Sequence, residues 1–313
     1  MIMTRQQHSR ASAQETRPRK LGQRKTHTPF AFRIIAGIVR PAMNVLMGKD
    51  WRDFDKFPAT GFIAVANHVS EIDPLAVGHA IYREGNTLHF LAKDSLFRVP
   101  VVGLALSKTD QIPVSRGDRS EVGKSLQVAA KVLDRGGAIV IYPEGTLTRD
   151  PDLWPMRAKS GAARLALTTG APVIPVTHWG VQDFLPPYSK RPKLLPRRKY
   201  TLQVGDEVDL SDLRTKPMTR TLLAEATQRI EEALTEGVAQ LRGENPPEQI
   251  WDRATKQRVP RNQIRARARQ TETPGGDPET SPEADPPLSP EPDSEHSAER
   301  GAEPGAAPEE RPA

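Results

Sequence analysis

From Gly61 onward, short apolar runs alternate with longer stretches whose apolar residues recur at helical spacing, and this alternation limits the possible folds more than any other feature. Strands that alternate with helices typically form βα units around a mostly parallel sheet. Six runs have the length and composition of strands: 62–66, 88–92, 111–114, 138–142, 173–177 and 200–208. We therefore predict an α/β fold with a mostly parallel central sheet flanked by helices.

Two helices are indicated by their ends and by one apolar face each. Ser120 is a typical N-cap residue, Gly136 with Gly137 ends the first helix, and the second begins near Thr219. The apolar faces consist of Val122, Leu126, Ala129 and Leu133, and of Leu223, Ala226, Ile230 and Leu234. Such faces are typical of helices that pack on their own domain.

Residues 29–56 form an apolar and basic segment ahead of the predicted sheet. Its apolar residues recur at helix-like spacing, and Pro41 is expected to kink the helix or to split it in two. One interpretation is an amphipathic segment that lies in a membrane interface. The other is an N-terminal helix packed on the domain. The flanking Arg and Lys residues favour the membrane interface.

The charge is unevenly distributed along the 313 residues. Residues 1–28 carry about +6 and are predicted to be a flexible basic lead-in, residues 29–270 carry about +10, and residues 271–313 about −10. The last segment holds ten Pro and a single large aliphatic residue, Leu288. It lacks the apolar surface that folding requires, so we predict a disordered acidic tail.

The main domain is placed at 57–245 and a basic extension at 246–270. Within the extension, residues 253–269 contain seven Lys or Arg and no acid. They are either a patch for anionic lipid or a solvated end of the domain. The basic folded part indicates an anionic partner, which can be a phosphorylated substrate, an anionic lipid or nucleic acid.

The absence of cysteine excludes a disulfide framework, a cysteine zinc site and a thiol nucleophile, and it permits a reducing cytoplasm. No stretch has the length and apolarity of a transmembrane helix. Arg33 and Arg40 interrupt the apolar run that a signal peptide would need. We expect a soluble or peripheral protein.

Four segments place reactive or anion-binding groups after predicted strands, at the edge where open α/β sheets bind ligands. In the first, His68 and Asp73 follow the strand at 62–66. An imidazole accepts a proton at neutral pH, and a carboxylate at its other nitrogen fixes the tautomer. A substrate hydroxyl would then be the nucleophile. The alternative is that Asp73 caps a helix starting at Pro74 and His68 is a structural loop residue.

The second segment places Arg116 after the strand at 111–114, where a guanidinium can bind phosphate through two hydrogen bonds. In the third, Glu144, Gly145 and Thr146 follow the strand at 138–142. This turn can offer backbone N–H groups to an anion. Glu144 can accept a hydrogen bond from a substrate hydroxyl or hold Arg116. An exposed Arg and an ordinary Pro-Gly turn are the alternatives.

The fourth segment is 171–176, which includes Pro175 and is preceded by Lys159. Lys159 can add positive charge to a phosphate site. The run with Pro175 is interpreted mainly as structural, at a sheet edge or a strand end.

In their order and spacing, these segments resemble the glycerolphosphate acyltransferase family, and most closely its bacterial 1-acyl-sn-glycerol-3-phosphate acyltransferases. The resemblance spans about residues 60–210. It rests on a His-x4-Asp block, an Arg block, a Pro-Glu-Gly-Thr block and a Val-Ile-Pro-Val block. It implies that His68 is the general base and Asp73 its partner. It also implies a glycerol-phosphate site, whose residues are Arg116, Glu144, Gly145 and Thr146.

The chain departs from the family directly after the Glu-Gly-Thr residues. The family has Arg at that position, whereas this chain has Leu147. Either Arg149, two residues further on, contacts the phosphate with help from Lys159, or the acceptor differs from lysophosphatidic acid.

The resemblance implies transfer of an acyl chain from acyl-CoA or acyl carrier protein to 1-acyl-sn-glycerol 3-phosphate, which gives phosphatidic acid. No metal or other cofactor is expected. The partners would be lysophosphatidic acid, the acyl carrier and an anionic membrane surface, on whose cytoplasmic face the protein would be peripheral. The alternatives are another glycerol-based acceptor or a non-catalytic membrane protein. Nucleic acid is not expected, because few aromatic residues are present to stack bases.

Overall fold

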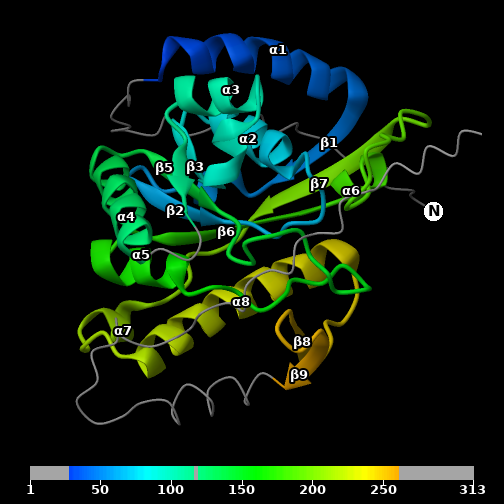
Figure 1. The fold of residues 1–313 in the computed structure, drawn as a ribbon. Coiled ribbons are helices and arrows are strands. Elements are labelled where there is room, and N and C mark those ends of the chain that lie inside the picture. Colours follow the sequence, from blue (N-terminus) through cyan, green and yellow to red (C-terminus); the bar gives the residue numbers. More distant parts are fainter. Residues whose placement is uncertain (1–27, 116–118, 261–313) are drawn as a thin grey trace, which may run out of the picture. The chain divides into compact units, whose positions relative to one another are not determined.

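The computed structural model describes residues 28–115 and 119–260. Seven strands form one sheet in the order β1-β7-β6-β2-β5-β3-β4 (Figure 1). They are β1 (Met47–Arg52), β2 (Phe62–Val65), β3 (Leu88–Lys93), β4 (Ile112–Val114), β5 (Ala138–Ile141), β6 (Val173–Trp179) and β7 (Arg198–Val204). Neighbouring strands in this sheet are parallel except for β6 with β7. The predicted α/β fold with a mostly parallel sheet is confirmed.

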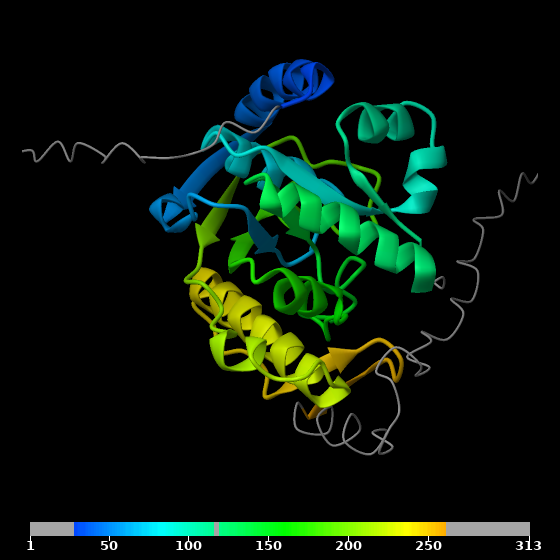
Figure 2. The same ribbon diagram turned by 90° about the vertical axis from the view of Figure 1, so that its left-hand side faces the viewer.

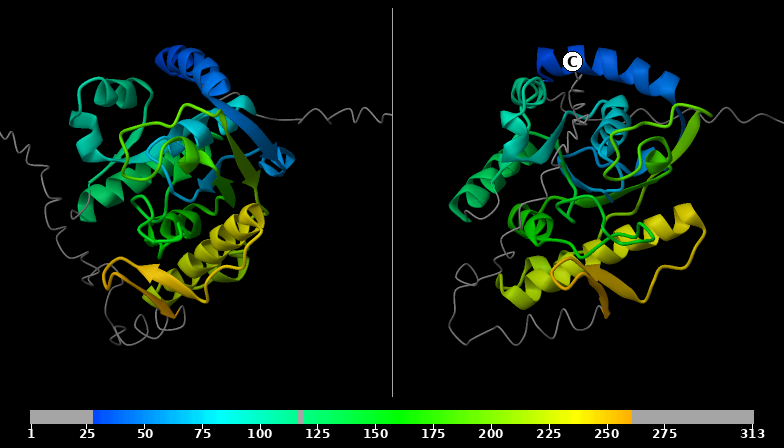
Figure 3. Two further views of the ribbon diagram at one scale, coloured as in Figure 1. Left: turned by 90° about the vertical axis from the view of Figure 1, so that its right-hand side faces the viewer. Right: turned by 45° about the vertical axis from the view of Figure 1, so that its right-hand side comes forward.

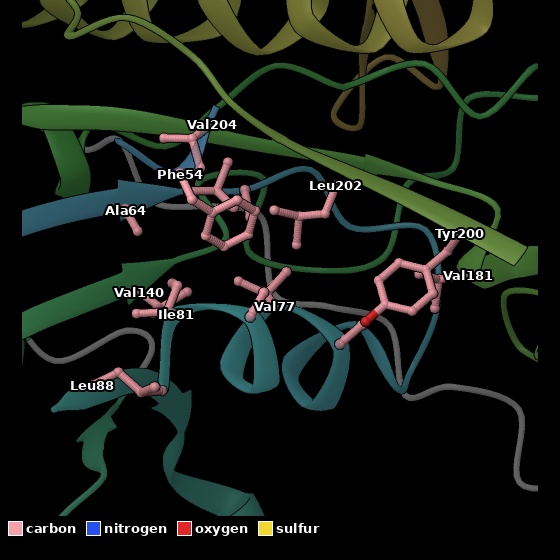
Figure 4. Close-up of a cluster of buried hydrophobic side chains, with 14 of the residues drawn as sticks. Phe54, Ala64, Val77, Ile81, Leu88, Val140, Val181, Tyr200, Leu202 and Val204 are labelled. Atoms are coloured by element: carbon pink, nitrogen blue, oxygen red, sulfur yellow. The ribbon is translucent and has the colours of Figure 1, made fainter. Parts of the chain in front are cut away.

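Helices cover both faces of this sheet. Helices α1 (Phe30–Leu46), α2 (Asp73–Arg83) and α3 (Val102–Lys108) lie on one side, and α4 (Arg119–Asp134), α5 (Gly161–Thr169) and α8 (Arg220–Arg242) on the other (Figures 1 and 2). Phe62 and Ala64 of β2 belong to the first core, shown in Figure 4, and Ile63 and Val65 to the second. Because successive side chains point to opposite faces and both faces are buried, the central strands β2 and β5 are apolar throughout.

The six predicted strands correspond to β2 through β7, with ends that shift by a few residues. Strand β1 lies within the segment that was predicted to be helical, so that prediction is wrong for its second half. Helix α1 ends at Leu46, and the chain continues in extended conformation to pair with β7. A strand at the edge of a sheet has one neighbour and is only partly buried, which leaves a weak sequence pattern.

Pro41 lies inside α1, which remains one helix, so the alternative of two short helices is wrong. Pro41 is on the exposed side of the helix, where water can satisfy the carbonyl that loses its hydrogen bond. Thr219 is the N-cap of α8 as predicted, and its side chain accepts a hydrogen bond from the Leu222 N–H at 3.1 Å. Helix α4 begins at Arg119, one residue before the predicted N-cap Ser120, an offset that is common at helix ends.

Pro175 lies inside β6, a central strand between β7 and β2, so the prediction of a sheet edge or a strand end is wrong. Proline has no N–H to donate, and Pro175 is tolerated here because it stands where the pairing of β6 with β2 ends and before the pairing of β6 with β7 begins. Pro175 is opposite Val65, the last residue of β2, and the antiparallel pairing with β7 begins at Val176.

The remaining elements are short. They are the 3-10 helices η1 (Phe54–Lys56) and η2 (Asp94–Arg98), the helices α6 (Val181–Phe184) and α7 (Ser211–Arg214), and the strands β8 (Gln249–Asp252) and β9 (Gln257–Pro260). The last two form an antiparallel hairpin near α8, within the predicted basic extension (Figure 3). The lead-in up to residue 27, residues 261–270 of the extension and the tail at 271–313 lie outside the described residues.

Candidate active site

The parallel strands β2 and β5 bring their following loops together at one edge of the sheet. Val65 pairs with Ile141 in register, so both strands end at the same level. The His68 N–H donates a hydrogen bond to Glu144 Oε1 at 3.2 Å, and the Thr148 N–H donates to the His68 carbonyl at 2.8 Å. The first and third predicted segments therefore form one site.

His68 and Asp73 form the predicted pair at the centre of this edge. Nδ1 of His68 lies 2.9 Å from Oδ2 of Asp73. A carboxylate can only accept, so Nδ1 carries the proton and Nε2 is left with a lone pair for a substrate. The His68 side chain is 17% exposed and Asp73 is fully buried, so only the imidazole is accessible from solvent.

Asp73 is the first residue of α2, and its carboxylate is turned away from that helix. Oδ2 also accepts hydrogen bonds from the N–H groups of Val69 at 2.7 Å and Ser70 at 2.8 Å. No side-chain cap bond is present at the start of α2. The alternative of Asp73 as a helix cap is therefore wrong, because three donors within the loop already use the carboxylate oxygen that faces them.

Tyr142 holds the imidazole from one face. The rings of His68 and Tyr142 are stacked, with centroids 4.1 Å apart and an angle of 23° between their planes. The pKa of the Tyr142 hydroxyl is raised well above its ordinary value, because burial disfavours the phenolate. A neutral aromatic ring thus limits rotation of His68. Sequence reasoning assigned Tyr142 to a strand end and gave it no role in the site.

Asn67 and His178 form a second contact that sequence reasoning missed. The Asn67 amide donates to the His178 carbonyl at 3.0 Å and accepts from the His178 N–H at 3.0 Å. Nε2 of His178 lies 2.9 Å from the Asn67 carbonyl and 3.8 Å from Oδ1 of Asp73. Burial lowers the pKa of His178, so the ring is neutral with its proton on Nε2. These bonds fix the start of the loop that carries His68.

Glu144 is buried behind His68, and both of its oxygens accept backbone hydrogen bonds. Oε1 accepts from His68, and Oε2 accepts from the Met156 N–H at 3.0 Å. Burial, only partly opposed by these bonds, raises the pKa of Glu144 to about 8. The geometry favours a residue that positions the His68 loop. A substrate hydroxyl bound by Glu144 stays a prediction.

The other predicted phosphate-binding residues are distributed along the loop after β5. The Gly145 N–H donates to the Tyr142 carbonyl at 2.9 Å, so this N–H does not face an anion. Leu147 is buried, whereas Arg149 is exposed and makes no side-chain hydrogen bond or ion pair with any described residue. Thr146 and Lys159 are half-buried.

Arg116 lies outside the described residues, between the end of β4 and the start of α4. The structure therefore does not test its predicted contact with phosphate.

The loop after β5 is held from its far side by α8 and by the β8–β9 hairpin. The Ala158 N–H donates to Oε1 of Glu231 on α8 at 2.6 Å. Nε and Nη2 of Arg258 on β9 donate to the two carboxylate oxygens of Asp150 at 2.8 and 2.6 Å. Arg258 thus neutralises an acid of the loop, and neither interpretation of the basic extension predicted this contact.

The structure thus combines a three-layer α/β domain with a partly exposed His68 hydrogen-bonded to the buried Asp73, a pair that can activate a hydroxyl for group transfer. A model of the acyltransferase family matches residues 51–179, which contain His68, Asp73, Glu144 and Lys159. Residues 51–179 of this chain are thus similar to the acyltransferase family.

Curated relatives support the finer resemblance. The chain is 31% identical over 127 residues to a chloroplastic 1-acyl-sn-glycerol-3-phosphate acyltransferase of Brassica napus, which is 41% of this chain and 35% of the relative. A protein of that name from Borreliella burgdorferi is 34% identical over 122 residues, 39% of this chain and 47% of the relative. One from Bacillus subtilis is 25% identical over 206 residues, 64% and 96% of the two chains.

The chain spans about a third to a half of the length of the first two of these relatives. Among solved structures, the 1-acyl-sn-glycerophosphate acyltransferase PlsC of Thermotoga maritima has a TM-score of 0.51 with 24% identity. The match covers 69% of this chain and 81% of that one, and it indicates the same fold. The resemblance inferred from the four sequence segments is confirmed.

Proposed function

We propose that this protein transfers an acyl chain from acyl-CoA or acyl carrier protein to the free hydroxyl of 1-acyl-sn-glycerol 3-phosphate, which gives phosphatidic acid. The observation that supports this most is the 2.9 Å contact between His68 Nδ1 and a buried Asp73, with the ring partly exposed. The relatives named for this reaction support the choice of acceptor.

In this mechanism Nε2 of His68 removes the proton of the acceptor hydroxyl, and the oxygen attacks the thioester carbonyl carbon. The tetrahedral intermediate collapses, the carbon–sulfur bond breaks, and the thiolate receives the proton from the imidazolium. Asp73 stabilises the charged imidazole and keeps its tautomer. The residues need no metal or other cofactor for these steps, and that expectation stays a prediction.

The acceptor phosphate would be bound by cations of the loop after β5, together with Arg116. Arg149 is exposed and has no side-chain partner among the described residues, so it can bind an anion without breaking an ion pair. Leu147 is buried and apolar. Because the Arg of the family is absent there, a different glycerol-based acceptor, such as glycerol 3-phosphate or another lysophospholipid, is the second candidate.

The lipid acceptor would be met at a membrane surface through α1. This helix has two faces, because Ala36 and Met43 are buried against the domain while Phe30, Ile34 and Ile38 are exposed at four-residue spacing. The buried face fits a helix packed on the domain, and the exposed apolar face supports the membrane-interface interpretation. Within residues 28–115 and 119–260, no helix combines the length and apolarity needed to cross a bilayer. We propose peripheral binding at the cytoplasmic face.

The test offers the purified full chain several lysophosphatides and glycerol 3-phosphate with acyl-CoA or acyl carrier protein, and identifies products by mass spectrometry. We expect phosphatidic acid from lysophosphatidic acid. His68→Ala should lose at least about 10²-fold in kcat. Asp73→Asn should also lose activity, because an amide can favour the wrong tautomer.

If His68 and Asp73 act as a unit, the double variant should be hardly slower than His68→Ala alone. Full activity in a folded His68→Ala protein would contradict the mechanism. No transfer by the wild type to any acceptor would favour a non-catalytic membrane protein.

A further inference from the structure

The segment between β3 and β4, made of η2 and α3, leaves an unusual number of aliphatic side chains exposed. Gly103 is the one buried residue of α3, and η2 has none. The exposed side chains are Leu96, Val99, Val101, Val102 and Leu104. A cluster of exposed aliphatic side chains on a folded domain marks a surface for another apolar partner. We call these five residues the η2–α3 patch.

Val101 at the start of α3 has a strained backbone and the most exposed side chain of the patch. Its φ is 67° and its ψ is −54°, and the Val102 N–H donates to the Pro100 carbonyl at 2.8 Å. A β-branched residue rarely adopts this three-residue turn. Strain of this kind persists only where the surrounding structure enforces it, and it is concentrated at functional sites. Here the strained turn leaves the Val101 side chain 80% exposed.

The patch is held in place by close packing beneath it. A Cβ atom on Gly103 would lie 2.0 Å from the carbonyl oxygen of Phe97, so α3 can approach η2 this closely only with glycine at that position. The aliphatic side chains are therefore presented on a preformed surface. Binding through it requires little ordering of the chain.

The patch lies beside α1 and next to the edge of the sheet that carries the site. Helix α3 contacts α1, whose outer side exposes Phe30, Ile34 and Ile38 (Figure 1). Strand β3 runs parallel to β5, so η2 follows β3 at the same edge at which the loop with Glu144 follows β5. An apolar phase in contact with η2 and α3 would therefore lie at the edge of the sheet that carries His68.

The charges around the patch favour a lipid bilayer over an apolar protein surface. Lys93 precedes η2 and Lys108 ends α3, and both are exposed. Arg98 ends η2 and is also exposed, although it pairs with Asp94 at 2.7 Å. Aliphatic side chains with a rim of Lys and Arg are typical of elements inserted at the level of lipid headgroups.

We propose that η2 and α3 form a second membrane-inserting element beside α1, with Val101 at its tip, and that its partner is a bilayer containing anionic phospholipid. This proposal extends the proposed function. It rests on that function only in taking a lipid as the partner of the patch. The lysolipid acceptor would then reach His68 directly from the bilayer.

The test measures binding of the full chain to vesicles of phosphatidylcholine and phosphatidylglycerol that contain neither acceptor nor thioester. Val101→Gly should lower the vesicle affinity by about tenfold, since it removes an inserted Val side chain. Its melting temperature should not fall, because glycine adopts this backbone conformation without strain. If Val101 served only to stabilise the fold, Val101→Gly would lower the melting temperature and leave the vesicle affinity unchanged.

A second variant and a matched control complete the experiment. Leu104→Gln, at a position 64% exposed, should also weaken vesicle binding by about tenfold. Val128→Gln on α4, a position 47% exposed on the other side of the sheet, should leave it unchanged. Unchanged affinity in both patch variants, or an equal loss in Val128→Gln, would overturn the proposal.

Acyl transfer to a short-chain acceptor dissolved as monomers separates this proposal from the proposed function. The patch variants should retain transfer to that acceptor, because the site is intact. Absence of transfer in the wild type would contradict the proposed function, but it would not affect the conclusion drawn from vesicle binding by the patch variants. Loss of monomer transfer in the patch variants would show that the patch serves the site directly, and would contradict a role limited to the membrane.

Discussion

Burial decides what Glu144 does at the candidate active site. The side chain lies beside His68, yet it is 1% exposed and its pKa is raised to about 8, first because burial disfavours the charged form. At neutral pH the carboxyl is mainly protonated, so it does not compete with Asp73 for the charge of the imidazolium. Asp73 thus stabilises the charged imidazole of His68, whereas the neutral Glu144 positions the loop that carries it.

The raised pKa of Glu144 predicts a pH-dependent contribution to stability. The folded state keeps a proton that the unfolded state releases above about 4.5, so the free energy of unfolding falls as pH rises from about 4.5 to 8. The slope is about 1.4 kcal/mol per pH unit for one proton. Glu144→Gln removes this ionisation and also one backbone hydrogen bond.

The stability advantage of the wild type over Glu144→Gln should therefore shrink between pH 5 and pH 8, measured by urea unfolding. The exposed Glu248→Gln serves as control, and its difference from the wild type should not change with pH in this way. A constant difference for Glu144→Gln would contradict the assignment.

The variant Arg149→Ala tests whether Arg149 binds the acceptor phosphate in place of the Arg that the family has at the position of Leu147. A charge-assisted hydrogen bond to phosphate contributes roughly 1.5 to 3 kcal/mol, so Arg149→Ala should raise the KM for the acceptor about tenfold or more. The KM for acyl-CoA should stay unchanged. Arg135→Ala, an exposed Arg after α4 at the opposite edge of the sheet, is the matched control. A rise confined to the KM for acyl-CoA would show that Arg149 does not bind the acceptor.

Among the secondary structure elements, α8 and the β8–β9 hairpin give the loop after β5 its conformation. A loop this long needs contacts from other elements to hold one arrangement. Arg242 at the end of α8 lies over the rings of Trp154 and Trp179, with its Cζ 4.2 and 4.5 Å from their centroids. Arg258 of the hairpin binds Asp150, whose side chain is 1% exposed. The elements on one side of the sheet thereby shape the site at its edge.

Arg258→Ala should destabilise the protein strongly, because it leaves the buried Asp150 carboxylate without its cation. Breaking a buried pair in this way costs about 3 to 5 kcal/mol. The double variant with Asp150→Asn should recover part of the loss, which a thermal unfolding cycle of the single and double variants would measure. Lys256→Ala, in the turn of the same hairpin, should have little effect. Additive losses in the cycle would contradict a direct pair.

At the scale of the whole molecule, the charge of the tail opposes that of the rest. Ending the chain after Thr271 removes about −10 of charge and no aromatic residue. The melting temperature should stay the same, whereas affinity for phosphatidylglycerol vesicles should rise at low salt. Vesicles of phosphatidylcholine alone are the control and should show no change. A large fall in melting temperature would show that the tail packs on the domain.

Much of the fold and part of the site follow from local sequence. Continuous apolar runs such as 138–142 indicate buried strands because both faces of a central parallel strand must be apolar. His68 and Asp73 are five positions apart, so a single loop brings them together. Their chemistry is a property of their residue types. The spacing left the helix-cap alternative open, and only the order of all four segments, with the resemblance it carries, favoured the pair.

Tertiary structure decided what depends on residues far apart in the chain. Strand β1 exists because β7 offers it a partner, and Asn67 meets His178 across 111 positions. Arg258 meets Asp150 across 108 positions, and Glu144 has its raised pKa because of burial. The sequence by itself determined strands β2 to β7, the helical faces and the candidate His–Asp pair, since each depends on neighbouring residues. Long-range contacts and burial depend on how the whole domain packs, which no local pattern encodes.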